Sequence, residues 1–207
     1  MSFQKRLLKI EQIEDEILRR ASRLMQEGGN IYVSDLFVLG AVKRVLALAS
    51  GFRTLMAERN FTCCAGLLRM QIDTAARVNA LKFVDSMDAL CQAVLSGKRF
   101  DKQKDRDGQF LRDNALISKL AADFPWVGDV YKETSGFVHL SERHMFTSMV
   151  NSDDTSRKIQ FFIGAKEPER PDEAYFEILD CFFEATEMTG SIILGYVEYR
   201  SKMDAQA

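Results

Sequence analysis

The chain's two histidines fall in one short segment, YKETSGFVHLSERH, which begins at Tyr131. Tyr131, Ser135 and His139 are spaced four residues apart, so on a helix their side chains share one face. Histidine exchanges a proton near neutral pH, which makes His139 beside two hydroxyl groups a candidate acid/base residue. The alternative is a buried structural histidine that fixes helix packing through hydrogen bonds. Ser141 and His144 are further binding candidates in the same segment.

A second polar group occurs in FTCCAGLLRMQIDTAARVNALKFV, where Arg69, Asp73 and Arg77 are again four residues apart. Their neighbours on this face are mostly small, and the opposite face is apolar, which is typical of a central helix. Buried charges are costly unless they are paired. One interpretation is therefore that Arg69 and Asp73 pair with each other or with a neighbouring helix. The other is that they meet the histidine-bearing helix and form a polar pocket inside a helical bundle.

No metal site and no cofactor are predicted. His139 and His144 are five residues apart, which separates them by about 140° around a helix and prevents joint chelation. Adjacent Cys63 and Cys64 suit neither a redox pair nor a zinc knuckle, and we expect all four cysteines to be core thiols in a reducing cytoplasm. Phosphate-binding loops and the common hydrolase motifs are absent from the sequence.

Helices must position these residues, because the first proline of the 207 residues is Pro125 and apolar residues recur at helical spacing. The sequence predicts one all-α domain over residues 1–207, a bundle of five to seven helices with a short extended or hairpin segment near 144–164. The expected helices cover residues 3–27, 35–59, 60–84, 86–96, 113–123, 125–141 and 172–202.

Charge and hydropathy restrict the partners. The net charge is −2, so no global basic field attracts nucleic acid. The charge-dense segment 97–112 either touches phosphates through its Lys and Arg residues or, because it also holds aspartates, is simply a solvated loop.

The first residues have no apolar signal region, and no uncharged run is long enough to cross a bilayer. A cytoplasmic protein without membrane contact is therefore expected.

Three segments resemble a known group of proteins: LLRMQIDTAARVNAL, DGQFLRDNALISKL and YKETSGFVHLSERH. Over residues 35–145 they look like bacterial helical proteins of uncharacterised or defence-related role, whose architecture is similar to that of the HEPN (higher eukaryotes and prokaryotes nucleotide-binding) superfamily. The resemblance implies a helical bundle, often a homodimer, with a polar site in a cleft and RNA or a nucleotide as ligand. In active members an arginine precedes the histidine by a few residues on one helix. Here Lys-Glu-Thr-Ser occupies 132–135, and Arg69 would have to replace that arginine.

Two functions are therefore carried forward. The first is an RNA-directed, HEPN-like effector, a metal-independent ribonuclease or toxin in which His139 is the acid/base and Arg69 holds phosphate. The second is a non-catalytic helical module that binds a partner or small ligand, with the same residues as structural contacts. The accompanying binding residues are Asp73, Arg77, Tyr131, Ser135, Ser141 and His144.

Self-association is also predicted. The last helix, 172–202, carries aromatic and aliphatic residues on more than one face, which would leave an apolar patch on a monomer. A twofold homodimer that buries the second face is the simplest solution, with the segment 144–164 crossing to the partner. The alternative is that the first helix, 3–27, covers the patch within one chain.

Overall fold

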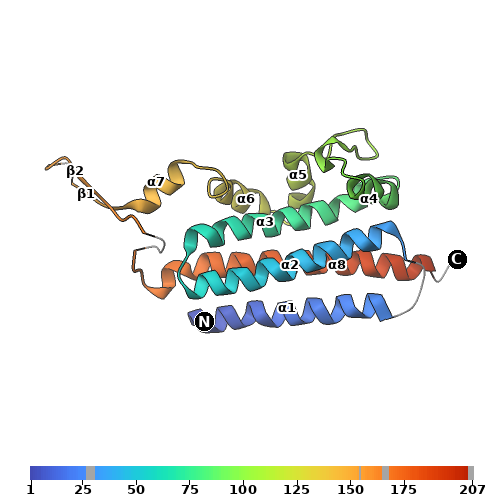
Figure 1. Ribbon diagram of the computed structural model, residues 1–207, viewed down its shortest axis with the longest axis horizontal. Coiled ribbons are helices and arrows are strands. Elements are labelled where there is room, and N and C mark those ends of the chain that lie inside the picture. The colour runs from blue at the N-terminus through green and yellow to red at the C-terminus, as the bar shows by residue number, and fades with distance from the viewer. Residues whose placement is uncertain (27–30, 154, 165–167, 205–207) are drawn as a thin grey trace.

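Long helices make up most of the computed structural model, which describes residues 1–26, 31–153, 155–164 and 168–204 (Figure 1). The α-helices are α1 (Phe3–Gln26), α2 (Val33–Ala57), α3 (Phe61–Asn79), α4 (Met87–Leu95), α5 (Asp113–Asp123), α6 (Val127–Ser135), α7 (Glu142–Ser148) and α8 (Phe176–Asp204). Short 3-10 helices are η1 (Ala80–Phe83), η2 (Phe100–Lys102) and η3 (Asp172–Tyr175), and the strands are β1 (Met149–Asp153) and β2 (Lys158–Phe161).

The predicted all-α fold with a short hairpin is confirmed. The described residues form eight α-helices, where five to seven were expected, because α7 occupies the start of the segment predicted to be extended. None of the described helices is both long enough and apolar enough to cross a bilayer.

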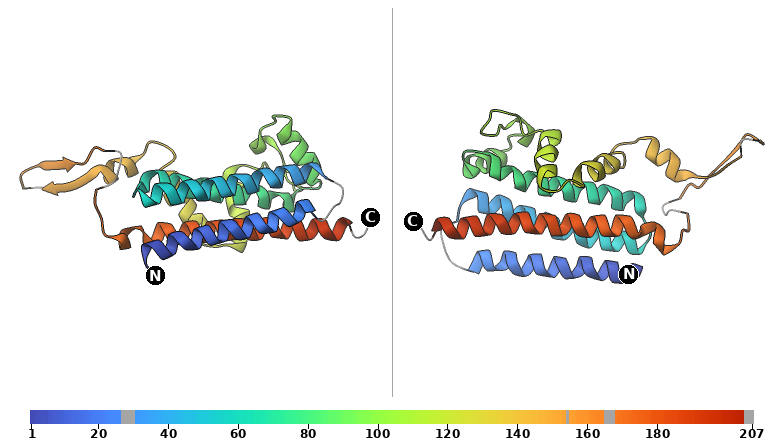
Figure 2. Two further views of the ribbon diagram at one scale, coloured as in Figure 1. Left: turned by 60° about the horizontal axis from the view of Figure 1, so that its bottom comes forward. Right: turned by 180° about the vertical axis from the view of Figure 1, so that it is seen from behind.

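Four long helices, α1, α2, α3 and α8, lie side by side, and α2 runs opposite to the other three (Figures 1 and 2). Helix α8 packs against all three partners, which explains why its sequence is apolar on more than one face. The rings of Phe52 in α2 and Phe182 in α8 stack with centroids 3.8 Å apart. Gln71 of α3 donates a hydrogen bond to Thr186 of α8 at 3.1 Å in the fully buried core.

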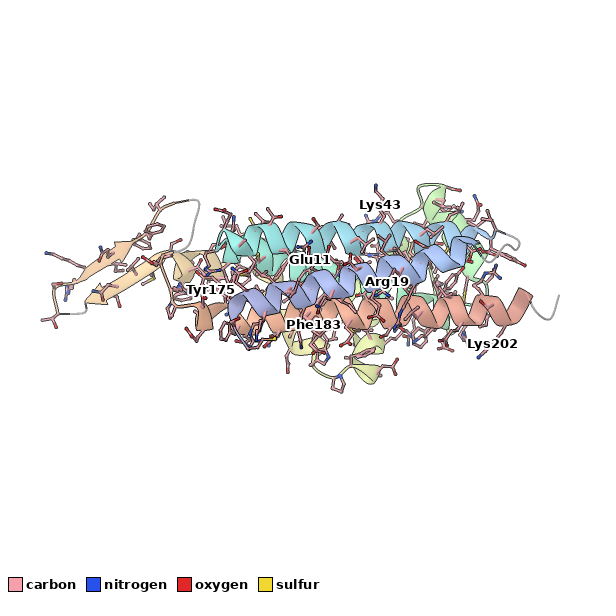
Figure 3. All side chains as sticks on the ribbon, turned by 90° about the horizontal axis from the view of Figure 1, so that it is seen from below. Glu11, Arg19, Lys43, Tyr175, Phe183 and Lys202 are labelled. Carbon is pink, nitrogen blue, oxygen red and sulfur yellow. The ribbon has the colours of Figure 1, made fainter. Side chains whose placement is uncertain are left out.

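Helix α1 is the outer helix of this group and lies across α2 and α8 (Figure 3). Phe3, Ile10 and Ile17 recur at every seventh position, so they share one face, and all three are buried. The opposite face carries charged residues. Arg53 Nε of α2 lies 2.6 Å from Glu14 Oε1 of α1, and this ion pair holds α1 in place.

A second layer formed by α4, α5 and α6 packs on the outer side of α2 and α3. The loop 97–112 connects α4 to α5, and most of its residues are exposed, as expected for a solvated loop, but Asp105 is an exception. Asp105 is buried at 6% exposure, accepts hydrogen bonds from the main-chain amides of Asp107 and Gln109, and lies 3.0 Å from Lys119 Nζ. An internal carboxylate therefore organises this turn.

An arm projects beyond one end of the bundle (Figure 1). We use this name for residues 138–163, which contain α7 and the antiparallel hairpin of β1 and β2. The prediction of an extended or hairpin excursion near 144–164 is confirmed for the described residues.

The four cysteines differ in their surroundings. Cys64 and Cys91 are buried, and burial raises the pKa of each thiol to about 12. Cys181 is half-buried, but Cys63 is exposed. The prediction of four core thiols is therefore wrong for Cys63, which lies on the first turn of α3 and faces outward.

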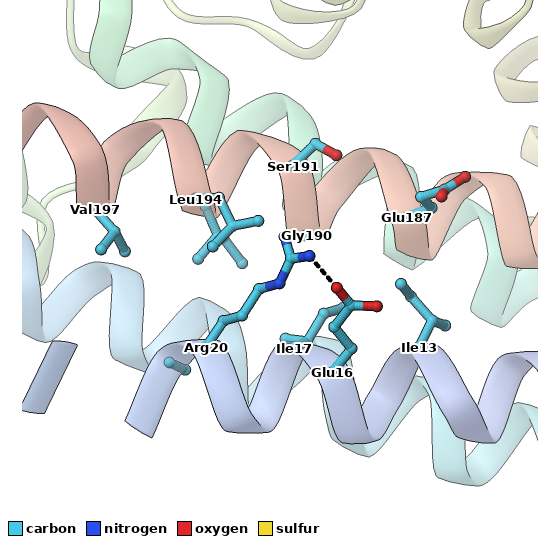
Figure 4. Close-up of a pocket in the computed structure, with 11 residues that line it drawn as sticks. Ile13, Glu16, Ile17, Arg20, Glu187, Gly190, Ser191, Leu194 and Val197 are labelled. Carbon is cyan, nitrogen blue, oxygen red and sulfur yellow. Dashed lines mark hydrogen bonds and ion pairs between the residues drawn. The ribbon is translucent and has the colours of Figure 1, made fainter. Parts of the chain in front are cut away.

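Helices α1 and α8 approach closely at Gly190. A Cβ atom at this position would lie 3.0 Å from Ile17 Cγ1 and 3.1 Å from Ile17 Cδ1. Beside this contact is a cavity of about 90 Å³, which Ile13 and Leu194 also line (Figure 4). The glycine lets α1 cover the outer face of α8.

We expect Gly190→Leu to lower the free energy of unfolding by about 1–3 kcal/mol, because the added side chain must displace Ile17. Gly195→Ala is the matched control in the same helix, where a Cβ meets nothing within 4 Å. Alanine has the higher helix propensity, so this change should raise the free energy of unfolding by about 0.5–1 kcal/mol. Chemical denaturation measures the free energy of unfolding of both variants. A change of the same sign in the two would contradict the close approach of α1 to α8 at Gly190.

Candidate functional site

Arg69 is the centre of the polar contact between α3 and α6. Its Nε donates to Ser135 Oγ at 3.2 Å, and its guanidinium carbon lies 3.2 Å from the centre of the Tyr131 ring. Its Nη1 lies 2.9 Å from Asp73 Oδ1, an ion pair without the angle of a hydrogen bond. Both interpretations of the sequence therefore hold in part: Arg69 pairs with Asp73 and also meets Tyr131 and Ser135.

Arg77 continues the spacing along α3 but contacts other elements. Its Nη2 lies 3.2 Å from Asp113 Oδ1 at the start of α5. Its guanidinium carbon also lies 5.1 Å from the centre of the Phe100 ring. Arg77 thus fastens α5 and η2 to the end of α3 and belongs to a separate contact from that of Arg69.

The predicted placement of His139 on the helical stripe is wrong. The helix expected over 125–141 ends at Ser135, and His139 lies in a bend with its side chain exposed. The chain folds back at Gly136, where a Cβ atom would lie only 2.8 Å from Arg143 Cγ and 3.0 Å from Ser141 Oγ. Among the described residues, no hydrogen bond or ring contact joins His139 to Arg69.

Ser141 and His144 have structural contacts at the start of α7. Ser141 Oγ accepts from the Arg143 amide at 3.2 Å and donates to the Gly136 carbonyl at 2.8 Å. The Ser141 amide donates to His144 Nδ1 at 3.4 Å. The His144 ring also lies edge-on to Phe137, with centroids 5.9 Å apart. These bonds close the turn that leads from α6 into the arm.

The hydroxyl groups near Arg69 are not arranged for proton transfer. Burial raises the pKa of Tyr131 to about 12, so its phenol stays protonated at neutral pH. Ser135 Oγ donates to the Tyr131 carbonyl at 2.6 Å while it accepts from Arg69, so no side-chain base activates it. Among the described residues, no group of three His, Cys, Asp or Glu side chains could hold a metal ion.

A second polar cluster, missed from the sequence, joins the start of α2 to the end of α8. Asp35 Oδ1 accepts from Tyr196 Oη at 2.6 Å and from Arg200 Nε at 3.1 Å, and Oδ2 accepts from the Tyr32 amide at 2.8 Å. Tyr196 Oη is also 2.8 Å from Ser34 Oγ. Asp35 and Arg200 are 7% and 5% exposed. The spacing of four between Tyr196 and Arg200 was the signal available in the sequence.

Burial and hydrogen bonding act on the pKa of Asp35 in opposite directions. Burial alone would raise it, but hydrogen bonds from Arg200, Tyr196 and the Tyr32 amide bring it below its usual value. A carboxylate whose pKa is lower in the folded state than in the unfolded state stabilises the fold above the unfolded pKa. That contribution is lost as the pH falls through the folded pKa.

We expect Asp35→Asn to lower the free energy of unfolding by about 3–5 kcal/mol at neutral pH, because it leaves Arg200 buried without its carboxylate. The difference from wild type should narrow below about pH 4, where the unfolded carboxyl takes up a proton. Denaturant titrations over a pH series measure this. Asp123→Asn is the control, since its carboxylate is exposed and lies 3.9 Å from Lys82. If the difference in unfolding free energy between Asp123→Asn and wild type narrowed equally, the lowered pKa would not belong to Asp35.

We expect Arg69→Met to lower the free energy of unfolding by about 1–3 kcal/mol and to speed amide hydrogen exchange in α6, because α6 loses its polar attachment to α3. Arg77→Met removes a more exposed pair and should cost about 0–1 kcal/mol. Hydrogen exchange followed by mass spectrometry localises the effect. Equal exchange in α6 for the two variants would show that Arg69 does not anchor this helix.

Comparisons of the chain with protein-family models, with curated proteins and with solved structures each gave no match. The function is therefore inferred from the geometry of the chain itself.

Proposed function

We propose that the chain is a non-catalytic helical module that binds a second copy of itself through the arm. The apolar surface of the arm carries this proposal. Leu140 and Ile163 are 92% and 94% exposed. The other exposed apolar residues of the arm are Val138, Met145, Phe146, Val150, Ile159, Phe161 and Phe162. So many apolar side chains exposed to solvent on one segment favour a contact with another protein chain.

The hairpin of the arm needs further support to be stable. All four residues of β2, Lys158–Phe161, are exposed, so no layer of the described chain covers either face of this strand. A two-stranded hairpin is at best marginally stable in water and normally gains stability from a third strand or a packed helix. A partner chain that covers the hairpin would supply this missing stabilisation.

The base of the arm offers a groove with both apolar and charged side chains. A groove of about 680 Å³ lies between α3, α6, α7 and the start of α8. Its lining includes Phe61, Leu68, Phe137 and Phe146, and Phe146 also belongs to the apolar surface of the arm. The groove and the arm are thus continuous on one chain. In a twofold dimer, each copy's arm lies in the other's groove, so both surfaces are buried by one symmetric contact.

The role of Arg69 in this proposal is to position the arm. It fixes α6 to α3 through Tyr131 and Ser135, and the arm begins directly after α6. A firmly attached α6 presents the arm in one direction, which lowers the entropy lost on association.

The earlier reason for a dimer does not hold. The second face of α8 was expected to need a partner chain, but α1 covers it within one chain. The proposal of a homodimer therefore rests on the arm and the groove.

Light scattering at micromolar concentration tests the dimer. We expect a mass twice the 23.6 kDa of one chain. The double variant Ile159→Asp with Phe161→Asp should return the mass to that of one chain, because both residues lie on one face of β2 and would bring charges into the contact. Gln160→Asp, on the opposite face of the same strand, is the control and should remain dimeric. A wild-type mass of one chain, or a dimeric double variant, would refute the proposal.

Incubation with total RNA tests the catalytic alternative. A non-catalytic module leaves the RNA intact, both as wild type and as His139→Ala. Cleavage by the wild type that is lost in His139→Ala, with unchanged thermal stability, would overturn the non-catalytic assignment and restore the RNA-directed effector.

A further inference from the structure

The loop 97–112 carries an exposed aromatic ring beside two cations, in the second layer and far from the arm (Figure 1). Phe110 is 40% exposed. Lys104 Nζ lies 5.1 Å from the centre of its ring, and the guanidinium carbon of Arg112 lies 5.3 Å from it. None of the residues considered above as catalytic belongs to this surface, which we call the loop face and define by Lys104, Phe110 and Arg112.

The backbone of the loop brings these three side chains together. Lys104 and Phe110 are partners in an antiparallel bridge, and the Leu111 amide donates to the Gln103 carbonyl at 2.9 Å. Side chains of an extended chain point alternately to opposite sides. Leu111 is therefore buried, whereas its neighbours Phe110 and Arg112 are exposed on the same side as Lys104.

The turn that joins the two halves of the loop is held by Asp105. Its buried carboxylate accepts hydrogen bonds from the main-chain amides of Asp107 and Gln109 and lies 3.0 Å from Lys119 Nζ in α5. The loop face is therefore formed before any ligand binds, which lowers the entropy lost on binding.

Positive charge is in excess on this loop. Arg99 pairs with Asp101 at 2.7 Å and Asp105 pairs with Lys119, so these charges offset one another. Asp107 is the remaining acid of the loop. The exposed cations that have no ion pair within the described part of the chain are Lys98, Lys102, Lys104 and Arg112.

Acids outside the loop are matched by other cations. Arg106 lines a cavity together with Asp85 and Asp88, so its charge is not counted here. Asp113, at the start of α5, lies 3.2 Å from Arg77. The loop thus presents four cations against one acid, although the net charge of the chain is −2. A local field of this sign attracts an anionic partner.

A shallow hollow of about 440 Å³ opens beside the Phe110 ring. Its other lining residues are Gln109, Arg112, Asn114, Ala115 and Ser118. The side-chain amides of Gln109 and Asn114 each offer donors and an acceptor, and neither has a hydrogen-bond partner among the described residues. Such amides suit the edge of a nucleobase.

We propose that the loop face binds single-stranded nucleic acid. A base stacks on Phe110, and the phosphates on either side of it lie near Lys104 and Arg112. Aromatic rings next to cations bind single strands in this way, because an unpaired base offers a flat face that a duplex keeps stacked. An acidic peptide would use the cations but leave the ring uncovered. The proposal requires no cleavage and does not rest on association of the chain with itself.

Fluorescence anisotropy with a labelled oligouridylate of about twelve nucleotides tests the stacked base in the full chain. Phe110→Leu should weaken binding by about fivefold or more, the effect of losing one stacked base. Phe110→Trp is the matched control at the same position, because it keeps a flat ring, and it should bind at least as tightly as wild type.

The salt dependence of binding tests the phosphate contacts. Lys104→Gln and Arg112→Gln should each reduce the slope of log affinity against log salt concentration by about 0.7, the value for one phosphate of a single strand. Lys43→Gln removes an exposed cation of α2 outside the loop face and should leave the slope unchanged.

Circular dichroism checks that each variant is folded, and the slopes of Lys104→Gln and Lys43→Gln decide the matter if Phe110→Leu is not. Equal affinity of wild type for a duplex of the same length, or for oligoglutamate, would overturn the proposal, the latter by identifying an acidic protein segment as the partner. Absence of binding, equal affinity of the two Phe110 variants, or equal slopes for Lys104→Gln and Lys43→Gln would also overturn it.

Discussion

The enclosure of α8 is the constraint on which the rest of the structure depends. This helix must bury apolar side chains on several faces, and α1, α2 and α3 each supply one of the surfaces that cover it. The buried hydrogen bond from Gln71 Nε2 to Thr186 Oγ1 joins α3 to α8 inside the core. The positions of α1 and of the Asp35 cluster, which both contact α8, follow from this enclosure.

Two polar clusters lie on this framework, and they serve different elements. Arg69, with Tyr131 and Ser135, attaches α6 and thereby directs the arm. Asp35, with Tyr196 and Arg200, joins the start of α2 to the end of α8. In both clusters the charged groups have partners of opposite charge, and the ordered side chains support neighbouring surfaces. Binding is proposed at the apolar surface of the arm, which Arg69 positions.

The sequence predicted the helices well, because long runs of apolar residues at helical spacing depend only on local geometry. The meeting of Arg69 with Tyr131 and Ser135 was also predictable, since a charge on a small-residue face of a central helix needs a partner. The end of α6 was missed because the chain folds back at Gly136 against Ser141 and Arg143, a turn that the helical spacing of polar residues does not reveal. The Asp35 cluster was missed because Tyr196 and Arg200 are 161 and 165 residues away from Asp35, and no local pattern brings them together.

The central place of α8 has a consequence for folding. Gln71 and Thr186 touch across 115 residues of chain, so the core closes only through contacts of long range in sequence. Until α8 is in place, the faces of α1, α2 and α3 that it covers lack that cover. A chain with many distant contacts completes its fold slowly, and apolar surface exposed in the meantime favours aggregation. Ribosomal synthesis would lengthen this interval, since α3 emerges long before α8.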